Sequence, residues 1–270
     1  ISQGEGNTII LARAGASKTT SLIQGSKYLP RGKKTLFCAF NKSIQEELRI
    51  KLPSYVDCFT LHSFGFRAVK SKFPNITLNN YKCFEIVEDF IGDRKSNFDL
   101  IDNICKAVHF CKMYLVDAPS KIKELLETVE VDLCEVEIDE FIKYVVKTLR
   151  LCKEKISELD FDEMLWLPFV YGISNKIYDV VFLDESQDMS KAAIELALSA
   201  VKKDGRVIAV LDNFQAIYGF MGADSKVLDN LRERLTPYKE LSLPISYRCP
   251  KKVIALAQKY VPDIQAYDKS

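Results

Sequence analysis

One stretch near the start of the chain restricts its fold more than any other. The apolar run Thr8–Leu11 passes through small residues to Lys18 and Thr19, and a segment of helical character follows over about 20–27. This is the layout of a phosphate-binding loop, in which backbone N–H groups and the positive end of a helix hold phosphate groups. The Lys would reach the phosphate oxygens, and the Thr hydroxyl would hold Mg²⁺. The residues expected to bind the phosphates and the metal ion are Ala14, Gly15, Ala16, Ser17, Lys18, Thr19 and Thr20.

The loop departs from the usual pattern at two positions. Ser17 stands directly before the Lys, and Ala12 stands at the first position of the loop, where the pattern has Gly. Glycine before the Lys lets the backbone approach the phosphates and adopt dihedral angles that a Cβ atom resists, at a cost of about 1–2 kcal/mol. Taken alone, the stretch leaves open an ordinary strand, turn and helix with a chance Lys-Thr pair.

A second stretch far downstream supports the same chemistry. Residues 178–183 form an apolar run typical of a buried parallel strand, and Asp184 and Glu185 follow it directly. Adjacent acids at the end of a strand divide two tasks well: Asp184 can hold Mg²⁺ through water, while Glu185 orients or deprotonates an attacking water. Together with the phosphate loop, this pair predicts nucleotide hydrolysis.

Polar residues also follow two strands that lie between these stretches. Phe40, Asn41 and Lys42 offer a stacking face, an amide and a cation, which suit the base and phosphate of a single nucleic-acid strand. Thr60–Ser63 closes the next strand and contains His62. Each has a structural alternative, since the first group also reads as a helix cap after a core Phe, and a lone His is often a satisfied structural residue.

Two later segments add candidate residues. Gln215 comes soon after the apolar strand 206–212, where it could sense a γ-phosphate, and Tyr218 and Phe220 follow at alternate positions, suited either to stacking on bases or to the core. Arg248, before a helical segment, is a candidate cation for the charge of a transition state.

The middle of the chain differs from the rest. From 73 to 154, apolar residues recur at helical spacing with clusters of Lys and Glu between them, which predicts an inserted helical subdomain without a catalytic constellation. The acidic turn Asp160–Glu163 that follows is expected to be structural, with a functional role as the alternative.

Composition limits the remaining classes. A formal net charge of +1 gives no overall electrostatic attraction to nucleic acid, so such binding would come from local surfaces. No apolar run is long enough to cross a membrane, and no signal peptide opens the chain. The eight Cys residues are scattered without CxxC pairs, which favours reduced thiols of an intracellular protein over a zinc site or disulfides.

The order of these segments resembles that of superfamily 1 DNA helicases of the UvrD/Rep type. The acidic pair matches their DExQD form of motif II, and the segment with Gln215 matches motif III of the form D-x-x-Q-x-I-Y-x-[FW]-x-G. The matching segments, in order, are Ala12–Thr20 (motif I), Phe40–Lys42 (Ia), Thr60–Ser63 (Ib), Asp160–Glu163 (an acidic motif), Asp184–Asp188 (II), Asp212–Gly222 (III) and Tyr247-Arg248 (IV).

The resemblance implies an α/β fold, a RecA-like phosphate-loop NTPase with a parallel sheet and an inserted helical subdomain. The first motor domain would cover 1–72 and 155–240, the insertion 73–154, and the start of a second motor domain 241–270. It implies ATP and Mg²⁺ as ligands, with Gln187 coupling to the γ-phosphate and Tyr247 stacking on adenine. The implied catalytic residues are Lys18, Asp184, Glu185, Gln215 and Arg248, and the implied nucleic-acid contacts are Phe40, Asn41, Lys42, Thr60, His62, Ser63, Tyr218 and Phe220.

The activity implied is ATP-driven translocation on single-stranded DNA and separation of a duplex at a single/double-strand junction, inside the cell. The chain begins at Ile1 and ends about twenty residues after Arg248, so a fragment without motifs V and VI is expected. Ser17, Met221 and Ser246 depart from the family pattern. Two other classes stay open: a binding module that no longer hydrolyses ATP because of Ser17, and a small-molecule kinase. The direction of travel, DNA against RNA, the pathway, the compartment and the oligomeric state also stay open.

Overall fold

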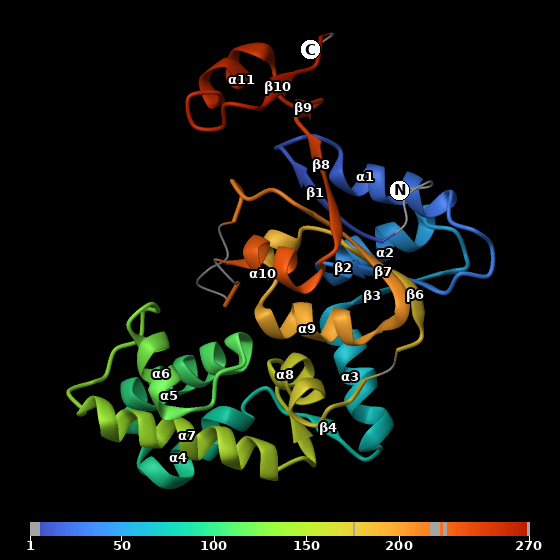
Figure 1. The fold of residues 1–270 in the computed structure, drawn as a ribbon. Helices are drawn as coiled ribbons and strands as arrows, with labels where there is room; N and C mark the ends of the chain where they lie inside the picture. Colours follow the sequence, from blue (N-terminus) through green and yellow to red (C-terminus); the bar gives the residue numbers. More distant parts are fainter. Residues whose placement is uncertain (1–5, 175, 217–221, 224–225, 269–270) are drawn as a thin grey trace.

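A six-stranded sheet forms the centre of the computed structural model, which describes residues 6–174, 176–216, 222–223 and 226–268 (Figure 1). Its strands are β1 (Asn7–Ala12), β2 (Thr35–Ala39), β3 (Val56–Thr60), β6 (Tyr178–Leu183), β7 (Val201–Leu211) and β8 (Tyr238–Leu243). The order across the sheet is β3-β2-β6-β7-β1-β8, and every neighbouring pair is parallel. The predicted α/β class with a parallel sheet is confirmed.

Helices cover both faces of the sheet, which explains why its strands are apolar on both sides. Ile10 and Phe182 belong to a core cluster on one face, whereas Ile9 and Val181 belong to a separate cluster on the other face, and each cluster contains residues of the helices that cover its face. The helices are α1 (Lys18–Lys27) and α2 (Lys42–Lys51) on the first face, and α3 (Leu61–Lys72), α9 (Lys191–Ser199) and α10 (Val227–Arg234) on the second. The alternation follows from the period of two in a strand.

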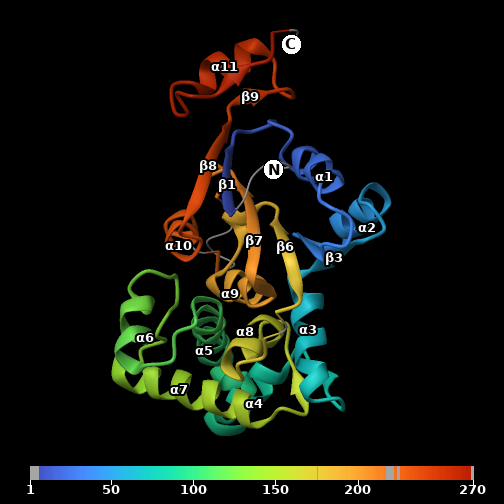
Figure 2. The ribbon, with the colours of Figure 1, turned by 45° about the vertical axis from the view of Figure 1, so that its right-hand side comes forward.

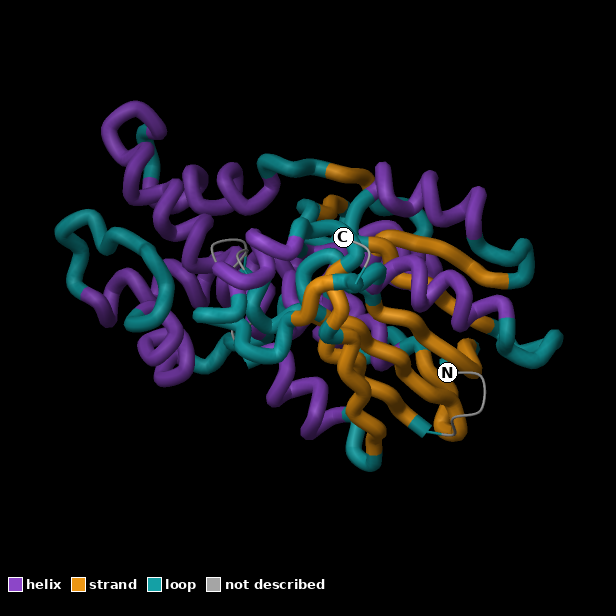
Figure 3. Tube along the Cα trace, turned by 90° about the horizontal axis from the view of Figure 1, so that it is seen from above, coloured by secondary structure: helices purple, strands orange, loops and turns teal. Residues whose placement is uncertain are grey.

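The predicted helical middle lies below the sheet and has a core of its own (Figures 1 and 2). Its helices are α4 (Lys82–Ile91), α5 (Arg94–Tyr114), α6 (Pro119–Leu126) and α7 (Ile138–Glu154). The short strands β4 (Thr77–Leu78) and β5 (Glu158–Leu159) pair in parallel, so the chain enters and leaves this part side by side. Helix α8 (Glu163–Val170) then leads back toward the sheet and packs on α3 and α9. Seen from above, many of these helices extend to one side while the strands gather on the other (Figure 3).

The last segment lies against the phosphate loop. It contains β9 (Ile245–Ser246), α11 (Lys251–Ala257) and β10 (Gln265–Ala266), which sit at the opposite end of the sheet from the helical part (Figure 1). The Tyr247 N–H donates to the Gly15 carbonyl at 2.9 Å. A Cβ atom at Gly15, which has φ 72°, would lie 2.7 Å from Cβ of Arg248. Strand β8 ends at Leu243, and the predicted domain limits stay predictions.

The next two features are the lack of a membrane-spanning helix among the described residues and the state of the cysteines. Among the described residues, no helix combines the length and the apolar character needed to cross a membrane. All eight cysteines are free thiols, and burial raises the pKa of Cys58 to about 11 and that of Cys111 to about 12. Buried thiols of this kind are unreactive.

Candidate active site

The two stretches that predicted phosphate chemistry meet at one edge of the sheet. The Lys18 Nζ atom lies 2.6 Å from Oε2 of Glu185. The Thr19 hydroxyl donates to Oδ2 of Asp184 at 2.6 Å, across 165 positions of sequence. The cation, the hydroxyl and both acids therefore belong to a single site.

The sheet topology explains this meeting. Strand β1 ends at Ala12 and β6 ends at Leu183, and only β7 lies between them in a sheet whose strands all point the same way. The loops after both strands consequently emerge at the same edge, where parallel sheets bind ligands. Helix α1 begins at Lys18, so its unpaired N–H groups face this edge.

Ser17 has the backbone conformation that its position demands. Its φ and ψ are 59° and 42°, in the left-handed region, and its side chain makes no capping hydrogen bond to α1. Glycine adopts this conformation without cost, whereas a residue with a Cβ does not. The loop thus keeps the expected shape with Ser in place of Gly.

A cavity of about 310 Å³ lies over the loop. Its walls are Gly15, Ala16, Ser17, Lys18, Thr19, Thr20, Glu185, Gln215, Tyr247 and Arg248. Of the other predicted residues, Ala14 is half-buried outside the cavity, while Asp184 and Gln187 are buried next to it. The set of a lysine, a hydroxyl, two carboxylates and a helix N-terminus suits a phosphate chain with Mg²⁺, for which Thr19 and Asp184 are the fitting oxygen ligands.

Hydrogen bonds connect the acids to the loop after β7. Gln187, in the turn η1 (Ser186–Asp188), donates from Nε2 to Oε2 of Glu185 at 2.8 Å and accepts from the Asp212 N–H at 3.1 Å. Burial raises the pKa of Asp184 to about 6, against the hydrogen bond from Thr19, which lowers it. An ionised Asp184 at neutral pH retains its capacity to bind a cation.

The predicted nucleic-acid residues follow β2 and β3, which are paired up to Ala39 and Thr60. The Asn41 side chain accepts from the Ile44 N–H at 2.9 Å, and Thr60 accepts from the Ser63 N–H at 3.2 Å, so both are helix caps. Phe40 and Lys42, on either side of Asn41, have exposed side chains. Tyr218, Phe220 and Met221 lie outside the described residues.

Sequence reasoning missed one aromatic contact. The ring of Phe161 stacks on that of His62, with centroids 3.8 Å apart and an angle of 21° between the planes, and 54% of Phe161 is exposed. Burial lowers the pKa of His62 to about 4, against Asp162, which raises it, so the ring is neutral at pH 7. The signal in the sequence was an aromatic residue inside an acidic turn, Asp160–Glu163, that we expected to be structural.

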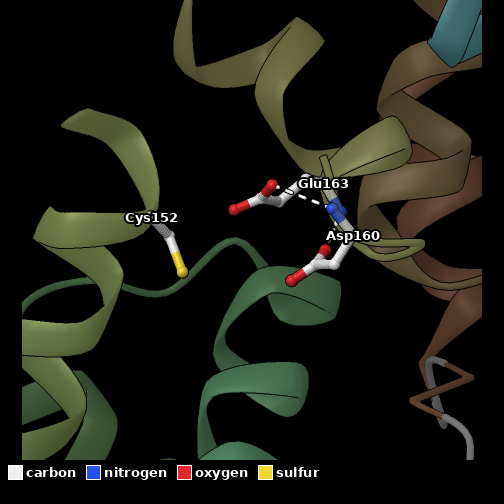
Figure 4. A group of neighbouring side chains, drawn as sticks. All are labelled: Cys152, Asp160 and Glu163. Atoms are coloured by element: carbon white, nitrogen blue, oxygen red, sulfur yellow. Dashed lines mark hydrogen bonds between the residues drawn. The ribbon is translucent and has the colours of Figure 1, made fainter. Parts of the chain in front are cut away.

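The same turn is anchored by a buried ionic cluster. Cys152, Asp160 and Glu163 converge closely enough to suggest a metal site (Figure 4). However, Lys82 Nζ lies 2.7 Å from Glu163, and Lys112 Nζ lies 2.6 Å from Asp160, with both lysine side chains fully buried. Two ammonium groups thus already compensate the two carboxylates, and the cluster is a structural support for the turn.

The fold and the site define a phosphate-loop nucleotide-binding domain. Over residues 1–236, the chain matches the family model described as the UvrD/REP helicase N-terminal domain, and it belongs to that family.

Three proteins that are named as DNA helicases are similar to this chain at low sequence identity. A probable DNA helicase II homolog of Mycoplasma genitalium is 24% identical over 100% of this chain and 42% of its own length. The F-box DNA helicase protein 1 of Schizosaccharomyces pombe is 24% identical over 92% of this chain and 30% of its own. The ATP-dependent DNA helicase PcrA of Staphylococcus epidermidis is 24% identical over 95% and 38%. The chain spans less than half the length of these relatives.

Proposed function

We propose that this chain is the ATP-binding motor portion of a DNA helicase, which hydrolyses ATP to move along single-stranded DNA and separate a duplex at a junction. The observation that carries the proposal is the convergence of Lys18 with Glu185 and of Thr19 with Asp184 in one cavity. Relatives of this chain are named as DNA helicases, which agrees with the proposal. The protein would then act inside the cell, where DNA is replicated and repaired.

Each residue of the site has a task in this proposal. Lys18 now pairs with Glu185, so it exchanges that carboxylate for phosphate oxygens when ATP binds, and Glu185 becomes free to orient the attacking water. Thr19 and Asp184 would hold Mg²⁺, which would supply positive charge to neutralise the phosphates. Gln215 and Arg248 line the same cavity, from which they would reach the γ-phosphate.

Neighbouring residues extend the site to adenine and to DNA. Tyr247 lines the cavity and is 54% exposed, with the ring of Tyr267 4.9 Å from its own, and its ring would stack on adenine. Phe40 and the stacked pair of His62 and Phe161 offer aromatic surface for bases at adjoining strand ends. Lys42 supplies a cation for the strand's phosphates.

The test is ATP hydrolysis by the protein at its full natural length, with and without single-stranded DNA. We expect DNA to stimulate turnover, and Lys18→Ala to reduce it about a hundredfold or more, because the charge that develops on the phosphates loses its cation. Lys27→Ala is the matched control, since Lys27 is exposed in the last turn of the same helix. ATP turnover that DNA does not change would indicate a small-molecule kinase. ATP binding without turnover would indicate a binding module that no longer hydrolyses ATP.

A further inference from the structure

Arg13, directly after β1, ties the phosphate loop to the last segment of the chain. Its Nε and Nη2 atoms donate to the two carboxylate oxygens of Asp263 at 2.8 and 2.6 Å. The Arg13 side chain is 8% exposed, whereas that of Asp263 is 48% exposed. The arrangement is the bidentate pairing that a planar guanidinium makes with a carboxylate, and it spans 250 positions of sequence.

The third guanidinium nitrogen faces the loop after β7. Nη1 of Arg13 donates to Oδ1 of Asn213 at 3.0 Å and lies 3.8 Å from Oδ1 of Asp212. The guanidinium carbon also lies 4.8 Å from the ring centroid of Phe214. One side chain therefore contacts two segments that are distant from it and from each other in sequence.

Both segments held by Arg13 lead to the cavity. On one side, Asp212 is hydrogen-bonded through its N–H to Gln187, which holds Glu185, and the loop continues to Gln215. On the other side, Asp263 precedes β10, which pairs with β9, and β9 is followed directly by Tyr247 and Arg248. Arg13 itself does not line the cavity.

We propose that Arg13, with Asp263 as its partner, is a positioning residue for ATP hydrolysis. It holds the loop after β7, which carries Gln215, and the Tyr247-Arg248 segment in fixed positions on the two sides of the phosphate site. The inference rests on the proposed function. An arginine suits the task because its five donors have a fixed planar geometry, which a lysine ammonium lacks. The half-exposed carboxylate lets the contact open when the last segment moves, because water then solvates Asp263.

The experiment compares Arg13→Lys, Asp263→Asn and the double variant in the protein at its full natural length. Asp268→Asn is the matched control, because it removes the same charge from an exposed position five residues further along. We measure kcat and KM for ATP with single-stranded DNA present. We also measure hydrogen exchange of the Phe214 and Gln215 amides, which now donate within the loop to Asp212.

Expected results separate positioning from simple stability. Arg13→Lys should lower kcat about tenfold or more and leave KM within about twofold, because the misplaced groups act on the transition state. Asp263→Asn should act in the same direction, and the double variant should be no worse than Arg13→Lys alone. Both amides should exchange several-fold faster in the variants, while Asp268→Asn should match the natural protein.

Other outcomes overturn the inference. If the variants keep kcat and amide exchange unchanged and only their melting temperature falls, the Arg13 contacts stabilise the fold and do not position the groups of the site. Additive losses in the double variant would show that Arg13 and Asp263 act independently. If the natural protein hydrolyses no ATP, the proposed function fails, and the amide exchange still decides whether Arg13 and Asp263 hold the loop.

Discussion

Replacing Ser17 by Gly tests whether the phosphate loop carries backbone strain. Ser17 has a left-handed backbone with φ 59°, and its side chain makes no capping hydrogen bond. Glycine adopts that conformation without strain, so Ser17→Gly removes a folded-state cost of about 1–2 kcal/mol. Glycine also gives the unfolded chain more conformational freedom, which lowers the free energy of unfolding by about 0.4–1 kcal/mol. The net expectation for Ser17→Gly is a gain of about 0.5–1 kcal/mol in the free energy of unfolding.

The assay is thermal unfolding without nucleotide, where this gain corresponds to a rise of about 1–4 °C in the melting temperature. Ser17→Ala is the control, because alanine keeps the Cβ atom and loses only a hydroxyl that caps nothing. It should stay within about 0.5 kcal/mol of the natural protein. If Ser17→Gly were no more stable than Ser17→Ala, the strain argument would be refuted.

The same pair of variants addresses nucleotide binding. Ser17 lines the cavity, where a missing Cβ lets phosphates approach the backbone more closely. We therefore expect Ser17→Gly to bind MgATP at least as tightly as the natural protein in calorimetry. Weaker binding by both variants would instead assign the Ser17 hydroxyl a contact with the nucleotide.

Three further perturbations concern the helical part, helix α3 and the acidic turn Asp160–Glu163. Lys112→Met leaves Asp160 partly uncompensated and should cost about 3–5 kcal/mol in urea unfolding, whereas the exposed Lys106→Met on the same helix should cost less than about 1 kcal/mol; equal losses would contradict the role of the buried charge. Because the pKa of His62 is about 4 in the folded protein and 6.5 otherwise, the unfolded chain binds more protons between these values, so stability falls as pH drops from 6.5 toward 4. From pH 7 to pH 5 this group should account for about 2 kcal/mol, a loss that His62→Gln should lack. Phe161→Ala should weaken binding of single-stranded DNA by about 1–3 kcal/mol in fluorescence anisotropy, and unchanged affinity would exclude stacking on Phe161.

The parts of the site that sequence could predict are those that local rules control. An apolar run followed by polar residues marks the end of a buried strand, and parallel strands present their carboxyl ends at one edge. This rule predicts from the sequence that Lys18 and Thr19 lie at the same edge as Asp184 and Glu185, and the structure places them in contact. The close contact also depends on the strand order, in which only β7 separates β1 from β6.

The remaining contacts depend on geometry that local rules do not contain. Whether Arg13 reaches Asp263 is set by the path of a chain that leaves β8, passes through α11 and returns in β10, and no periodicity in the sequence encodes that path. A buried arginine that follows a strand is rare unless its guanidinium is paired, so its burial demands partners without naming them. The structure supplies two acids and an amide from two separate segments, one of which carries Gln215. Because those partners are shared between both walls of the cavity, a change at Arg13 should alter both walls together, which no single motif of the sequence predicts.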